Sequence, residues 1–96
     1  MDVNPQILRK LKILVIDDEE NHAHATAEVL ERVGYHVTTA TSGETGLRTL
    51  EAERFGIVIT DLNMSPVSGM DILRAAKAID PRTQVLLVSG TSNVDS

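Results

Sequence analysis

Three short apolar runs constrain this sequence more than any other feature. Each run is four residues long and rich in aliphatic residues, and together they cover Ile13–Ile16, Ile57–Thr60 and Val85–Val88. Runs of this kind are typical of strands that are buried on both faces, as in a parallel sheet with helices packed on each side. The sequence therefore predicts an α/β fold built around a parallel sheet.

Amphipathic segments separate the apolar runs. After the first run, Ala23, Ala27 and Leu30 recur at helical spacing, which predicts a helix over residues 21–33 with one apolar face. Gly34 follows as a natural helix stop. A shorter and less apolar strand is expected over residues 35–40, nearer an edge of the sheet.

Two further helices are expected to begin at capping boxes, in which a side chain caps the helix start and an acid three residues later reaches back. Thr41 and Glu44 have this spacing, and so do Ser68 and Asp71. Asp80-Pro81 ends the second of these helices. The resulting order is β-α-β-α-β-α-β with the start of one more helix near the last residue, which predicts one layered α/β domain with right-handed crossovers.

Composition excludes several classes of protein. There is no cysteine, so disulfides and thiolate metal sites are excluded. The net charge is −5 with no basic stripe, which argues against direct binding of nucleic acid by this chain. The apolar runs are too short to span a bilayer, and the first residues lack a secretory signal. A cytoplasmic domain with no membrane contact is expected.

Acidic residues follow two of the apolar runs directly. Asp17 and Asp18 come after the first run, and Asp61 comes after the second. The carboxyl ends of parallel strands share one edge of the sheet, so these acids converge if their strands are neighbours. Converging carboxylates call for a hard divalent cation such as Mg²⁺, and a carboxylate can attack phosphorus. Ser89, after the third run, could then hydrogen-bond a phosphoryl oxygen.

Each of these acids also has an ordinary structural interpretation. A single acid after a strand usually serves a turn or caps a helix, and Asp18 or Glu19 would favour the start of the next helix. The coincidence of three acids and a hydroxyl at the ends of apolar strands favours a site for metal-assisted phosphoryl transfer. His22 and His24 are two residues apart on a helix and cannot share a face, so they are interpreted as solvated.

Four strings then identify a family resemblance. They are ILVIDDEEN, TSGETGL, VITDLNMSPVSGMDIL and VLLVSG, and in this order and spacing they resemble the receiver domains of bacterial two-component response regulators. The resemblance implies a receiver domain over residues 12–96, after a lead-in over residues 1–11. It implies a flavodoxin-like sheet of strand order 2-1-3-4-5. Four strands in the order 2-1-3-4 are expected here, without the last strand and the last two helices.

The resemblance also implies roles for individual residues. Asp61 would be the phosphoacceptor, Ser89 the switch hydroxyl, and Gly90 a backbone N–H donor to the phosphoryl group. The implied Mg²⁺ ligands are the carboxylates of Asp61 and Asp18, the main-chain carbonyl of Asn63 and, through water, Asp17. The implied partners are a sensor histidine kinase or phosphotransfer protein and an output domain or effector. Such a domain phosphorylates itself and is not a turnover enzyme.

Two departures from the family pattern have consequences. The family usually has proline at the position of Ser65, whereas Pro66 comes one residue later here. The lysine and the aromatic residue of the family's fifth strand lie outside this sequence. We expect the strand over Val85–Val88 to have an exposed edge, so that the fragment is either marginally folded or self-associates.

Three alternatives remain open from the sequence. A degenerate receiver would serve as a docking module without phosphorylation. A Mg²⁺-dependent phosphatase of the haloacid-dehalogenase type would need a second aspartate two residues after the first, and the run Asp17–Glu20 lacks that spacing. A nucleotide-binding domain would need a glycine-rich loop where this acidic run stands.

Overall fold

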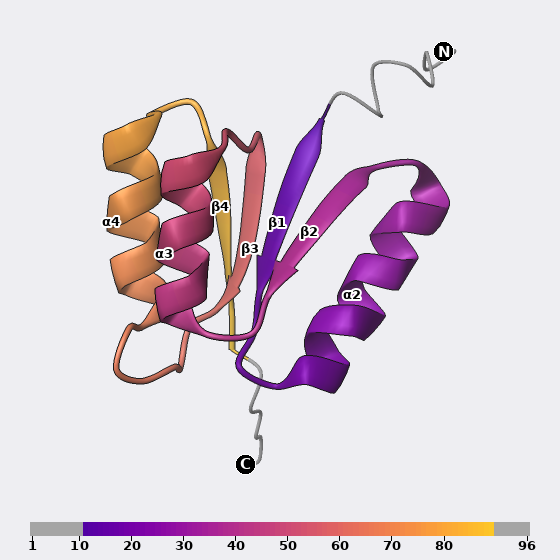
Figure 1. The fold of residues 1–96 in the computed structure, drawn as a ribbon, viewed down its shortest axis with the longest axis horizontal. Helices are drawn as coiled ribbons and strands as arrows, with labels where there is room; N and C mark the ends of the chain where they lie inside the picture. Colours follow the sequence, from indigo (N-terminus) through magenta and orange to yellow (C-terminus); the bar gives the residue numbers. More distant parts are fainter. Residues whose placement is uncertain (1–10, 90–96) are drawn as a thin grey trace.

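The computed structural model describes residues 11–89 and confirms the predicted α/β fold. Its four strands form one parallel sheet in the order β2-β1-β3-β4, as the resemblance implied (Figure 1). Helix α2 covers one face of the sheet, and α3 and α4 lie side by side on the other. Along the chain the elements are β1 (Lys12–Ile16), α2 (Glu20–Val33), β2 (His36–Ala40), α3 (Gly43–Ala52), β3 (Ile57–Asp61), α4 (Gly69–Ile79) and β4 (Gln84–Val88).

Strand β1 is central and carries both halves of the core. Leu14 and Ile16 belong to the cluster on the side of α3 and α4, whereas Ile13 and Val15 pack with Ala23 on the side of α2. Successive strand side chains point to opposite faces, so an uninterrupted apolar run is needed where both faces are covered. The four apolar residues are at most 2% exposed, which confirms the expectation for this run.

The helix ends test the expected caps. Gly34 adopts the left-handed conformation, with φ of 117°, and ends α2 as predicted. The capping box of Ser68 and Asp71 is also confirmed. The box expected at Thr41 is wrong, because Ser42 is the cap of α3 and its hydroxyl accepts the N–H of Thr45 at 3.1 Å. Helix α3 therefore starts one residue later than predicted, so the position three residues past its cap is a threonine.

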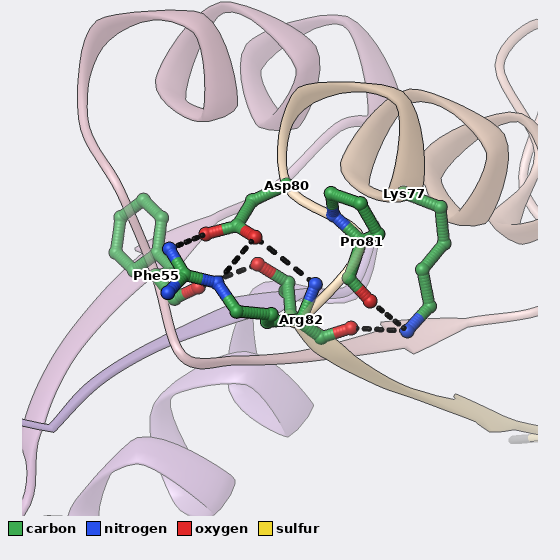
Figure 2. A network of polar contacts seen from close by, with 6 residues as sticks. Phe55, Lys77, Asp80, Pro81 and Arg82 are labelled. Atoms are coloured by element: carbon green, nitrogen blue, oxygen red, sulfur yellow. Dashed lines mark hydrogen bonds and ion pairs between the residues drawn. The ribbon is translucent and has the colours of Figure 1, made fainter.

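The connection between α4 and β4 is a network of polar contacts at the end of the sheet opposite the acids (Figure 2). Arg82 donates from Nε and Nη2 to the two carboxylate oxygens of Asp80, at 3.1 and 3.3 Å. Lys77 Nζ donates to the main-chain carbonyls of Pro81 and Thr83. The buried Thr83 hydroxyl donates to the carbonyl of Phe55 at 2.9 Å. These contacts fix the start of β4 beside the start of β3.

Strand β4 is exposed along much of its length. Leu86 is 50% exposed and Val88 is 45% exposed, and among residues 11–89 no strand pairs with the outer edge of β4. The expectation of an exposed edge over Val85–Val88 holds for the part of the chain that the structure describes. Among the helices of that same part, none is long and apolar enough to cross a membrane.

Candidate functional site

The strand register brings the acids together at the carboxyl edge of the sheet. Ile16 of β1 lies opposite Thr60 of β3, so Asp17 and Asp61 each come one residue after a matched pair. The N–H of Asp17 donates to the carbonyl of Ala40 at the end of β2, at 3.1 Å. The acids are therefore placed by β1 and its two neighbours together, as expected if the first and third strands are adjacent.

The carboxylates of Asp17, Asp18 and Asp61 form one cluster. Each offers an oxygen, and these oxygens all lie within 4.8 Å of one another. Asp17 Oδ1 accepts the N–H of Glu19 at 2.9 Å, and Asp61 Oδ1 accepts the N–H of Asn63 at 3.1 Å. One oxygen of each of these two side chains is thus oriented by the backbone two residues later, while Asp18 is exposed.

The donor set of this cluster suits a hard divalent cation. Carboxylate oxygens are the ligands that Mg²⁺ takes from proteins, usually one or two of them with several waters. Among the ion pairs of residues 11–89, none joins a lysine or arginine to these three carboxylates. Three like charges this close repel one another, and a bound cation removes that repulsion. The residues present therefore fit Mg²⁺.

His22 is a neighbour of the site that the sequence interpretation did not foresee. Its Nε2 lies 2.8 Å from Glu19 Oε1, and its Nδ1 lies 3.8 Å from Asp17 Oδ2. The side chain is 59% exposed, so its interpretation as solvated is right for exposure but missed these contacts. The signal available in the sequence was the spacing of three residues from Glu19, which places both side chains on one face of the first helical turn.

The remaining predicted residues fall at the same edge of the sheet or outside the described chain. Asn63 is exposed, and its N–H faces Asp61. Ser89 directly follows Val88, the β4 residue that lies opposite Asp61, and is also exposed. Gly90 lies outside the described residues, as does the further helix expected near the last residue. Glu20 is the first residue of α2, and it is not part of the acidic cluster.

The loop after Asp61 is anchored at several points. Met64 is buried, and Val67 packs against the core on the side of α3 and α4. The carbonyl of Leu62 accepts the N–H of Gly69 at 3.0 Å. The Ser65–Pro66 peptide is cis. Through Met64 and Val67 the loop returns to the core, and the Leu62–Gly69 hydrogen bond closes it on the start of α4.

Comparison with known proteins finds relatives over most of this chain. The family model described as the response regulator receiver domain matches residues 13–96. The chain is 30% identical to the response regulator receiver protein CpdR of Brucella abortus, over 86% of this chain and 69% of that protein. It is 31% identical to the transcriptional regulatory protein ZraR of Salmonella typhimurium, over 91% of this chain. The chain spans only 20% of ZraR.

Solved structures agree with these sequence relatives. The response regulator TrrA of Thermotoga maritima, solved in complex with Mg²⁺ and BeF, has a TM-score of 0.75 and 30% identity over 80% of this chain and 67% of that one. A response regulator of Burkholderia pseudomallei, solved with a phosphorylated aspartic acid, a calcium ion and citrate, has a TM-score of 0.79 and 30% identity. That match covers 88% of this chain and 50% of the other.

Proposed function

This chain belongs to the response regulator receiver domain family of two-component systems, and from that membership we propose that Asp61 is its phosphoacceptor. The observation that carries the proposal is the cluster of Asp17, Asp18 and Asp61, whose oxygens lie within 4.8 Å of one another at the carboxyl edge of the sheet. Of the three, only Asp61 is the last residue of a central strand. It lies opposite Val88, and Ser89 is the next residue after Val88.

The chemistry proposed for these residues is an in-line phosphoryl transfer. A carboxylate oxygen of Asp61 forms a bond to phosphorus while the bond between phosphorus and the donor's leaving atom breaks. Because the N–H of Asn63 donates a hydrogen bond to Asp61 Oδ1, the proposed attacking atom is Oδ2. The Ser89 hydroxyl and the Gly90 N–H would donate to the transferred phosphoryl oxygens. The domain modifies itself in this reaction and does not turn over a substrate.

Mg²⁺ is the proposed cofactor of the reaction. When bound, it neutralises the charge that accumulates between the acids and the phosphoryl oxygens. Asp18 and Asp61 would hold it through their carboxylates, Asn63 through its carbonyl and Asp17 through water. The relatives solved with Mg²⁺ or calcium support this assignment.

Mass spectrometry after incubation with acetyl phosphate and Mg²⁺ tests the acceptor. We expect one added phosphoryl group in the unmodified sequence and none in Asp61→Asn. Asp80→Asn, which changes an aspartate at the opposite end of the sheet, is the matched control and should be phosphorylated normally. A stable phosphate on serine or histidine that persists in Asp61→Asn would contradict the assignment. The absence of phosphate from every variant would favour the docking-module alternative.

Receiver domains work with histidine kinases or phosphotransfer proteins, and the relatives named above include a transcriptional regulator. For this chain we propose a sensor histidine kinase or phosphotransfer protein as the donor, and an output domain or effector as the target. Placement in the cytoplasm remains a prediction from composition. The acidic balance and the absence of a basic stripe argue against direct contact with nucleic acid.

Self-association through β4 is a separate part of the partner proposal. Its support is the unpaired outer edge of β4 among residues 11–89, together with the exposed side chains of Leu86 and Val88. Sedimentation across a concentration series should show a mass that rises with concentration, and Leu86→Glu should reduce that rise. Val29→Glu on α2, at a residue that is 60% exposed, is the control. A monomer at every concentration would contradict self-association.

A further inference from the structure

Helices α3 and α4 begin in the same way, and both beginnings touch the loop that follows Asp61. Each helix is capped by a serine, Ser42 or Ser68, whose hydroxyl accepts a backbone N–H. Each cap is followed by a buried glycine, Gly43 or Gly69, as the first helical residue. Neither glycine has a positive φ, so backbone conformation does not explain why a side chain is absent there.

Gly69 lies against the backbone of the acceptor itself. A Cβ placed on Gly69 would be 2.5 Å from the carbonyl oxygen of Asp61 and 2.7 Å from the Cα of Leu62. Real Cβ contacts are not this short, and backbone atoms cannot turn aside as a side chain can. The same carbonyl of Asp61 accepts the hydroxyl of the fully buried Thr60 at 3.0 Å. An alanine at residue 69 would therefore displace the main chain that carries the acceptor.

Gly43 lies against the far end of the same loop. A Cβ placed on Gly43 would be 2.6 Å from both the Cβ and the carbonyl oxygen of Val67. Val67 packs against the core on the side of α3 and α4, so it has little room to retreat. The loop over residues 62–68 is thus in close contact with one glycine at each end, from two neighbouring helices.

We propose that Gly43 and Gly69 are positioning residues for phosphoryl transfer, holding the loop over residues 62–68 so that Asp61 and Asn63 keep the geometry needed for Mg²⁺ and phosphate. The inference rests on the proposed function and deepens it, because it assigns a role to residues that touch neither the metal nor the phosphoryl group. Between the two contacts the loop exposes Asn63, whose N–H bonds Asp61 and whose carbonyl is a proposed Mg²⁺ ligand.

The test compares three alanine substitutions of glycine. Gly69→Ala and Gly43→Ala should each weaken Mg²⁺ binding about tenfold, as changes behind metal ligands commonly do. They should slow phosphorylation by acetyl phosphate by about tenfold to a hundredfold, because displacements near 1 Å have such effects. Gly56→Ala is the matched control at the other end of β3, where the added carbon would come too close only to the end of the flexible Leu11 side chain. It should behave as the unmodified protein.

A readout without metal or phosphate separates positioning from activity. In the metal-free protein, the amide NMR resonance of Asn63 should shift in Gly69→Ala and Gly43→Ala and stay in place in Gly56→Ala. Val67→Ala removes the Cγ atoms of Val67, which contact the core and the side of Gly43, without adding a clash, and it should weaken Mg²⁺ binding less but in the same direction. It keeps the test decisive if either glycine variant fails to fold.

The outcomes separate the two proposals. If the unmodified protein neither binds Mg²⁺ nor accepts phosphate, the proposed function fails, and the positioning role that rests on it fails too. If the unmodified protein does both, and the folded glycine variants or Val67→Ala match it in Mg²⁺ affinity and Asn63 resonance, the positioning role is overturned. Equal losses in Gly56→Ala would also overturn it, because they would show a general effect on β3.

Discussion

The two ends of the sheet differ in whether their charged side chains are paired. The carboxyl edge with the three aspartates is the acidic end, and the opposite edge with Asp80 and Arg82 is the paired end. At the carboxyl edge, Asp17, Asp18 and Asp61 crowd together, and no lysine or arginine of residues 11–89 pairs with them. At the opposite end, Asp80 is bound by Arg82 (Figure 2). Lys12 Nζ there lies 2.9 Å from Glu53 Oε2. The charges at the opposite end are thus paired within the described chain, whereas lysine and arginine leave those at the carboxyl edge unpaired there.

This difference separates the residues that stabilise the fold from those proposed to bind the cation. The contacts between α4 and β4 hold the starts of the strands in place without help from a ligand. The acids at the other end raise the free energy of the metal-free protein through repulsion, and binding of a cation relieves it. Sites that bind ions keep such uncompensated charge, and we expect substitutions at the two ends to respond differently to Mg²⁺.

The largest expected effect is at the paired end. Thr83→Val removes the buried donor to the carbonyl of Phe55, and we expect the free energy of unfolding to fall by about 1 to 3 kcal/mol. Mg²⁺ affinity should not change, because Thr83 is remote from the acids. Urea unfolding with and without Mg²⁺ measures both quantities. Thr49→Val, whose hydroxyl bonds a carbonyl within α3, is the control and should lose much less.

The next effect belongs to the acidic end. At a Mg²⁺ concentration tenfold above Kd, ligand binding to the folded state alone should stabilise the protein by about 1.4 kcal/mol. Asp18→Ala should abolish most of this gain, whereas Glu20→Ala should keep it because Glu20 lies outside the cluster. Thermal melts across a Mg²⁺ series provide the measurement. Equal losses in the two variants would show that the acidic run acts only as diffuse negative charge.

The smallest effect is the acid dependence of two hydrogen-bonded carboxylates, Asp80 at the paired end and Asp71 in the first turn of α4. Hydrogen bonds from the Arg82 side chain and backbone lower the pKa of Asp80, and the Ser68 backbone and hydroxyl lower the pKa of Asp71. A lowered pKa in the folded state adds stability above the unfolded pKa and loses it as the pH falls through the folded value. We therefore expect stability to decline below about pH 4.

Asp71 is exposed and Asp80 is partly exposed, so their share of that decline is small. Asp80→Asn and Arg82→Gln should each flatten the decline, since either change removes the ion pair. Chemical unfolding at a series of acidic pH values tests this. Unchanged slopes in both variants would mean that the pair between Asp80 and Arg82 adds nothing to acid stability.

Much of the fold and of the site could be predicted from short stretches of sequence. The run Ile13–Ile16 indicated a strand covered on both faces, and the acids after two such runs indicated a cluster at one edge. The capping box at Ser68 was equally local, because it depends on residues within one helical turn. The choice of Thr41 over Ser42 failed because either hydroxyl can cap a helix, and the acid three residues after Thr41 favoured the wrong one.

The sequence by itself determined the order of the elements, the strand ends that carry acids and the family to which the chain belongs. The order of the elements follows from short apolar runs and from helical periodicity, which a few consecutive side chains express. The family follows from the four strings that resemble receiver domains. Only the tertiary structure decided that Thr83 reaches Phe55, and that Gly43 and Gly69 lie against the loop over residues 62–68. Those contacts depend on strand register and on how helices pack across the sheet, which no short stretch of sequence encodes.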